Sequence, residues 1–115
     1  MILITISTVK KEIKTMKRTK TMIYQASTES NELFLFITND ADLYRQTIQP
    51  AINNLKKKYK KGIYDINKAV DLWYYVATNG SNLYNKYYGY NFTVTERFTC
   101  AIDLEKYFKE DIENF

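Results

Sequence analysis

Carboxylates are the residues of this sequence best suited to acid–base chemistry or to binding a divalent cation. Asp40 and Asp42 form a close pair, but no Gly-rich phosphate loop, calcium-loop motif or Glu-x-x-His motif accompanies them. The chain has no histidine and one cysteine, Cys100, which excludes Cys/His zinc sites, Ser-His or Cys-His catalytic pairs and an intrachain disulfide. We therefore expect a protein that is not an enzyme and has no metal or cofactor, with Cys100 buried as a small apolar residue.

Structural roles account for the carboxylates more simply. We expect those near helix starts to cap helices or to interact with helix dipoles, and the later ones to form a solvated acidic face. The first group is Asp40, Asp42, Asp65 and Asp71, and the second is Asp103, Glu105, Glu110, Asp111 and Glu113.

Five lysines surround Tyr59 in one short stretch: Lys56, Lys57, Lys58, Lys60 and Lys61. On a helix they would spread over about 200° of surface. Cations stabilise a helix C-terminus by about 0.3–1 kcal/mol each, which is less than the repulsion among five of them, whereas phosphates would bind them and release counterions. We interpret the five lysines as a binding site for nucleic acid or an acidic protein. A solvated helix end is the alternative.

Tyrosine is the second unusual feature, with 11 in the chain. We expect Tyr84 and Tyr87 to be buried with Trp73, and Tyr88 and Tyr90 to be exposed near the basic helix end, together with Tyr74 and Tyr75. Exposed tyrosines are common at interfaces and can stack on unpaired bases. Tyr88 and Tyr90 therefore join the five lysines as candidate binding residues, with simple surface packing as the alternative.

Length and composition point to one globular domain, since the 115 residues are 45% hydrophobic and 26% charged. No apolar run approaches the length of a membrane span. Charge is unevenly distributed: residues 1–61 hold 12 Lys and Arg against 5 Asp and Glu, whereas residues 62–115 hold 5 against 8. This asymmetry favours a polyanionic partner or head-to-tail contacts between copies.

The first twenty residues carry six cations against one anion and form a basic arm, which we predict to be flexible. The alternatives are an arm that orders on nucleic acid, a leader that precedes a start at Met16 or Met22, and an edge strand over Ile2 to Ile6. Residues 21–115 are predicted to form a single helical domain.

The remaining sequence has a helical period of 3.6 residues. The first segment has an apolar face from Leu33 to Tyr59 on which Asp40 is the only polar residue. Ser27 to Ser30 supplies N-cap candidates for its start. Pro50 predicts a kink or a break, and Gly62 predicts the helix end. A short β-hairpin near residues 21–37 is the alternative for the start of this segment.

Two more helices are predicted. The first begins after the N-cap Asp65, has an apolar face that starts at Ile66, and ends at Gly89. Gly80 lies on its apolar face, which indicates close approach by a neighbouring segment, although a break at Asn79-Gly80-Ser81 is the alternative. The second opens with a capping box formed by Thr93 and Glu96. The fold class is thus all-α, a compact bundle of three to four helices.

Several stretches resemble short reading frames of bacteriophages and mobile elements. They are LFLFITNDADLY (33–44), INNLKKK (52–58), KGIYD (61–65) and AVDLWYYV (69–76). The resemblance covers residues 30–112. It implies a small accessory protein of the bacterial cytoplasm, a class in which many members act on host machinery and some inhibit CRISPR nucleases.

These observations predict an anti-CRISPR-like protein that modulates a host defence or nucleic-acid-handling complex. Its partner would be a host nucleic-acid-processing protein or the nucleic acid itself, with no membrane involved. The alternative is a helical homo-oligomer with a structural or accessory phage role and no nucleic-acid contact.

Overall fold

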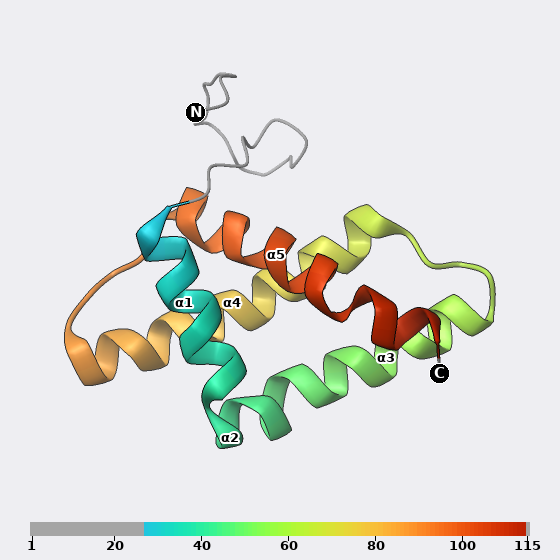
Figure 1. Ribbon diagram of the computed structural model, residues 1–115, viewed down its shortest axis with the longest axis horizontal. Coiled ribbons are helices and arrows are strands. Elements are labelled where there is room, and N and C mark those ends of the chain that lie inside the picture. Colours follow the sequence, from blue (N-terminus) through green and yellow to red (C-terminus); the bar gives the residue numbers. More distant parts are fainter. Residues whose placement is uncertain (1–26, 115) are drawn as a thin grey trace.

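The computed structural model describes residues 27–114, and all of the regular structure there is helical (Figure 1). Four helical rods form a compact bundle, the second of them continuous through a π-helical turn, η3. The elements in chain order are α1 (Thr28–Asn39), α2 (Ala41–Leu43), η3 (Tyr44–Ile48), α3 (Gln49–Lys60), α4 (Ile66–Tyr88) and α5 (Val94–Glu113). The all-α prediction is confirmed. The hairpin alternative is wrong for residues 33–37, which lie in α1, while residues 21–26 and the basic arm lie outside the described residues.

The first apolar segment divides at Asp40 and not at Pro50. Asp40 has extended backbone angles (φ −90°, ψ 117°), and its carboxylate accepts a hydrogen bond from the Leu43 N–H at 2.9 Å, so it caps α2. Pro50 lies in the first turn of α3, directly after the π-helical turn, where the Gln49 N–H donates to the carbonyl of Tyr44. The wider turn accommodates the missing proline donor without ending the helix.

The predicted caps at the other helix ends are present. Ser27 is the N-cap of α1 and forms a capping box with Ser30. Thr93 is the N-cap of α5 and forms a capping box with Glu96. Asp65 caps α4 by accepting from the Asn67 N–H at 2.9 Å. Each cap satisfies amide groups that the first helical turn leaves without partners, which explains where these helices begin.

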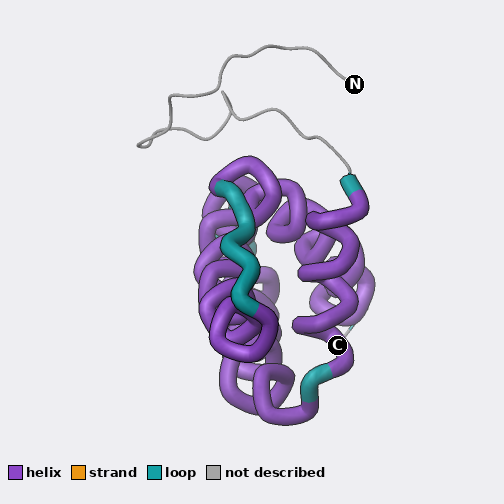
Figure 2. Tube along the Cα trace, turned by 90° about the vertical axis from the view of Figure 1, so that its left-hand side faces the viewer, coloured by secondary structure: helices purple, strands orange, loops and turns teal. Residues whose placement is uncertain are grey.

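The core centres on Trp73 of α4, which is fully buried and stacks on Phe108 of α5 with 5.2 Å between ring centroids. Helices α4 and α5 cross as the central pair, and α1 and α3 pack against both of them (Figure 1). The tube in Figure 2 shows the helices stacked closely in an oblong body, with extents of 36 × 32 × 22 Å. The two ends of the long helix α4 therefore lie at opposite ends of the bundle.

Gly80 lies where α1 crosses α4, and α4 continues through it unbroken. A Cβ atom at Gly80 would come within 2.3 Å of Cγ1 of Ile37, a side chain that is fully buried. The predicted close approach is confirmed, and the predicted alternative of a break at Asn79-Gly80-Ser81 is wrong. Glycine is retained here because the two helices have no room for a methyl group.

We predict that Gly80→Ala destabilises the protein, although alanine is the better helix former by about 1 kcal/mol. The added methyl group overpacks the crossing, and the free energy of unfolding in urea should fall by about 1–3 kcal/mol. Asn82→Ala, at an exposed position of the same helix, is the control and should change little. Pairing Gly80→Ala with Ile37→Ala should recover part of the loss. Higher stability of the single variant would contradict the close contact.

Candidate functional site

The basic end of α3 is built by a helix-ending motif. Gly62 has φ +76°, and its N–H donates to the Tyr59 carbonyl, while the Ile63 N–H donates to the Lys58 carbonyl, each at 3.0 Å. These two bonds form a Schellman motif, which satisfies carbonyls that the last helical turn leaves open. The motif turns the chain away from the helix axis and leaves the lysine-rich turn at the end of the bundle.

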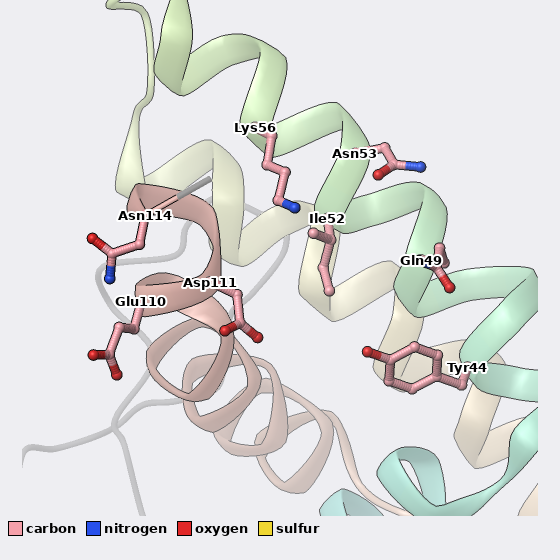
Figure 3. Close-up of a pocket in the computed structure, with 8 residues that line it drawn as sticks. All are labelled: Tyr44, Gln49, Ile52, Asn53, Lys56, Glu110, Asp111 and Asn114. Carbon is pink, nitrogen blue, oxygen red and sulfur yellow. The ribbon is translucent and has the colours of Figure 1, made fainter.

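The lysines around Tyr59 do not all lie alike. Lys57, Lys60 and Lys61 are exposed, whereas Lys56 and Lys58 are partly buried. Figure 3 shows the Lys56 side chain extending from α3 toward α5, where Glu110 and Asp111 lie. Because Lys56 extends toward α5, we separate it from the predicted group of five. We use the term basic end for the other four: Lys57, Lys58, Lys60 and Lys61.

Lys56 lines a polar pocket of about 430 Å³ between α3 and the last turns of α5 (Figure 3). The pocket wall combines amides, two carboxylates and a phenol, from Tyr44, Gln49, Ile52, Asn53, Lys56, Glu110, Asp111 and Asn114. Glu110, Asp111 and Glu113 are exposed, as predicted for the acidic tail. Glu110 and Asp111 line the pocket together with Lys56, so this pocket holds both signs of charge.

Exposed apolar side chains lie beside the basic end, and sequence reasoning did not identify them as surface features. Ile63 is 60% exposed, Ile66 is 47% exposed and Tyr59 is 40% exposed. Ile66 was expected on the buried face of its helix, but it lies in the first turn, beyond the reach of the core. The signal that could have found Ile63 is its position between Gly62, which ends a helix, and Asp65, which caps the next.

A buried hydrogen bond anchors the connection between α3 and α4. The Tyr64 hydroxyl donates to Oε2 of Glu105 at 2.7 Å, and Glu105 is only 2% exposed. Burial raises the pKa of Tyr64 above its ordinary range, and the Glu105 carboxylate raises that pKa further. The prediction that Glu105 belongs to a solvated acidic face is wrong, because its carboxylate is needed inside to pair with this phenol.

Tyr88 and Tyr90 lie at the opposite end of the molecule from the lysines. The basic end precedes the start of α4, whereas Tyr88 is the last residue of that helix (Figure 1). The 23 residues of α4 span about 34 Å. The predicted single surface of lysines with Tyr88 and Tyr90 is therefore not formed, and Tyr59 is the tyrosine that accompanies the lysines.

Tyr88 and Tyr90 belong instead to an aromatic cluster that joins the end of α4 to α1. Phe36 packs edge-on against Tyr84 with 5.1 Å between ring centroids, and Tyr84 lies 4.7 Å from Tyr88. Tyr87 and Tyr88 are 59% and 66% exposed. Burial of Tyr87 is thus a wrong prediction, because α4 extends past the core before it reaches this residue.

A groove of about 430 Å³ runs along this aromatic cluster, and we call it the aromatic groove. Aromatic, aliphatic and acidic side chains line it, from Glu32, Leu35, Phe36, Asn39, Asp40, Tyr84 and Tyr88. Loss of solvent contact and the charge of Glu32 raise the pKa of Tyr84. The Tyr90 hydroxyl lies 3.3 Å from Glu96, and burial with the charges of Glu96 and Glu29 raises its pKa.

Cys100 is fully buried, as predicted, and its burial raises the pKa of its thiol. Among residues 27–114, no group of three Cys, Asp or Glu side chains is arranged to hold a metal ion. The two surfaces that distinguish this part of the chain are the basic end and the aromatic groove.

We predict that Tyr64→Phe lowers the free energy of unfolding by about 1–3 kcal/mol at neutral pH, because Glu105 stays buried without its donor. Urea unfolding followed by circular dichroism measures this loss. Tyr75→Phe removes the hydroxyl of a ring that is 65% exposed, so this control should be nearly neutral. An equal effect of the two substitutions would contradict a structural role for the Tyr64 hydrogen bond.

The same variant tests the direction of the Tyr64 pKa. Because the folded state raises that pKa above its ordinary value of 10.0, the folded state holds the phenol proton more tightly than the unfolded chain. The resulting stability is complete below pH 10 and is lost as the pH rises through the folded value. Tyr64→Phe should therefore lose less stability than the wild type above pH 10, and parallel losses would contradict the shift. Cys100 titrates in both proteins and cancels in the comparison.

No helix in the described part of the chain is long and apolar enough to cross a membrane. Comparisons of the sequence with protein-family models and with curated proteins, and of the fold with solved structures, find no match.

Proposed function

We propose that this chain is a small, non-enzymatic binding protein of phage or mobile-element type that contacts nucleic acid through its basic end. Its target would be a host nucleic-acid-handling or defence complex, as the resemblance to phage reading frames suggests. The observation that carries the proposal is the placement of Lys57, Lys58, Lys60 and Lys61 around a helix terminus at one end of the bundle, with Tyr59 among them.

The fold tolerates these lysines but does not require so many of them at this position. Each cation gains about 0.3–1 kcal/mol from the helix dipole, and like charges three or four residues apart lose a few tenths of a kcal/mol through repulsion. Lys57 with Lys60 and Lys57 with Lys61 have this spacing. A phosphate backbone would relieve the repulsion, since each phosphate bound neutralises charge and releases counterions.

Tyr59 favours nucleic acid over an acidic protein as the target. Its ring packs edge-on against Tyr64 at 5.9 Å and remains 40% exposed between lysines. An exposed ring within a basic patch can stack on an unpaired base while the cations hold the neighbouring phosphates. Single-stranded regions of RNA or DNA therefore fit this surface better than a duplex does.

We predict that the chain binds single-stranded oligonucleotides with an affinity that falls as salt rises, with a log–log slope of about −0.7 for each phosphate contacted. Lys57→Glu should weaken binding and make the slope shallower, as measured by fluorescence anisotropy. Lys86→Glu is the matched control, because Lys86 is also exposed and also lies in the last turn of its helix. Equal effects of the two substitutions would show that binding depends only on net charge and would contradict a binding site at the basic end.

The host part of the proposal has its own test. The wild-type chain, used to capture proteins from host lysate, should retain nucleic-acid-handling proteins in a nuclease-sensitive manner. Combined substitution of Lys57, Lys58, Lys60 and Lys61 by Glu should abolish that retention, because the phosphate contacts are lost. Retention of the same proteins by this variant would contradict a role for the basic end.

A further inference from the structure

The aromatic groove is an exposed apolar surface for which the proposed function has no use. Leu35, at 46% exposure, and Tyr88, at 66%, lie along it. The Phe36 and Tyr84 rings form its floor and are partly buried. A contiguous exposed apolar area on a small protein commonly marks an interaction site, whereas single exposed apolar residues are normal on protein surfaces.

The groove is also acidic. Glu32 and Asp40 are the carboxylates that line it, and no lysine or arginine of residues 27–114 does so. Glu29 and Glu96 extend the negative charge along the same end of the molecule, as their effect on the Tyr90 pKa indicates. A partner that fits this groove must therefore combine positive charge with apolar surface.

The opposite end of the same chain combines these two properties. The basic end carries Lys57 and Lys61 on one helix face, four residues apart, and both side chains are exposed. Ile63 and Ile66 add apolar area beside them. Lysine has an apolar stem that packs on rings and an ammonium group that interacts with carboxylates or with aromatic faces.

These two ends cannot meet within one molecule. The basic end adjoins the first turn of α4 and the aromatic groove contains its last turn, so the length of that helix separates them. The complementarity of the two surfaces can be used only between copies of the chain.

We propose that the aromatic groove binds the basic end of a second copy of this chain. The contact is heterologous, because each copy uses a different surface, so repeated contacts produce rings or open chains rather than a closed pair. Ammonium groups of the incoming lysines lie near Glu32 and Asp40, and their stems pack over Phe36 and Tyr88. Because the same lysines serve in the proposed nucleic-acid contact, assembly and nucleic-acid binding compete.

The test measures mass against concentration by sedimentation velocity, in low-salt buffer and at about 0.5 M salt, where charges are screened within a few ångströms. The wild type should associate with rising concentration at low salt and dissociate at high salt. Glu32→Lys, and separately Lys57→Glu with Lys61→Glu, should each weaken association by at least about tenfold, because like charges then face each other.

Mixing the two variants provides the decisive arm. The lysines of the Glu32→Lys protein still match the intact groove of the Lys57→Glu/Lys61→Glu protein. The introduced glutamates match the introduced groove lysine, so both mixed pairings are attractive and both self-pairings are repulsive. The mixture should therefore form a complex in which the two variants alternate, although neither variant associates alone. Absence of this complex, or a wild type that stays monomeric at low salt up to millimolar concentration, overturns the proposal.

Two further measurements separate this proposal from others. Tyr88→Ala removes apolar contact without changing charge, should also weaken association, and decides the outcome if Glu32→Lys fails to fold. Glu32→Lys and Tyr88→Ala should leave oligonucleotide affinity undiminished, since neither touches the basic end. If Glu32→Lys and Tyr88→Ala lose association but still bind oligonucleotides, the result supports the groove contact. If only the lysine variants lose oligonucleotide binding, that result supports the proposed nucleic-acid function.

Discussion

The packing of Trp73 against Phe108 is the contact on which the rest of the structure depends. It fixes the crossing of α4 over α5, and α1 and α3 then pack against that pair. The fully buried Trp73 lies in the first half of α4, so both ends of this long helix extend beyond the contact. One end carries the turn from α3, and the other carries Tyr87 and Tyr88 into solvent. The exposed surfaces of the molecule therefore follow from how its largest core residue is placed.

Local patterns predicted most of the fold, because caps and period depend on neighbouring residues. Ser27, Asp65, Gly89 and the Thr93–Glu96 box were all visible in the sequence, and Gly80 indicated a close contact. The position of the first break was not, since the apolar face continues in phase past Asp40 although the backbone turns there. Nor could periodicity pair Tyr64 with Glu105, which lie 41 residues apart. Three of the five lysines are exposed, whereas Lys56 and Lys58 are partly buried. Which aromatic residues lie beside them depended on the length of α4.

The two oppositely charged surfaces of this bundle have the same composition in one respect: each combines charged side chains with exposed apolar ones. The basic end combines lysines with Tyr59 and Ile63, and the aromatic groove combines Glu32 and Asp40 with exposed rings. Each surface joins charge, which directs encounter, to apolar area, which holds the partner once water is displaced. If the lysines serve both nucleic acid and a second copy, the protein concentration decides which contact is made. Polyanions that bind the lysines would then compete with the second copy and dissociate the assembly.

The π-helical turn before Pro50 accommodates one extra residue in the helical rod that leads to the lysines. It holds five residues, from Tyr44 to Ile48, and its wider hydrogen-bonded ring accommodates one residue more than an α-helical turn. One residue corresponds to about 100° of rotation about a helix axis. Loss of one residue from a regular α-helix would rotate everything that follows by this angle. Loss of one residue from this turn would instead let it close as an α-helical turn, so Ile52 and Leu55 would still face the core. A single-codon deletion in this turn, about ten residues before the lysines, should therefore leave the direction of the charged surface unchanged.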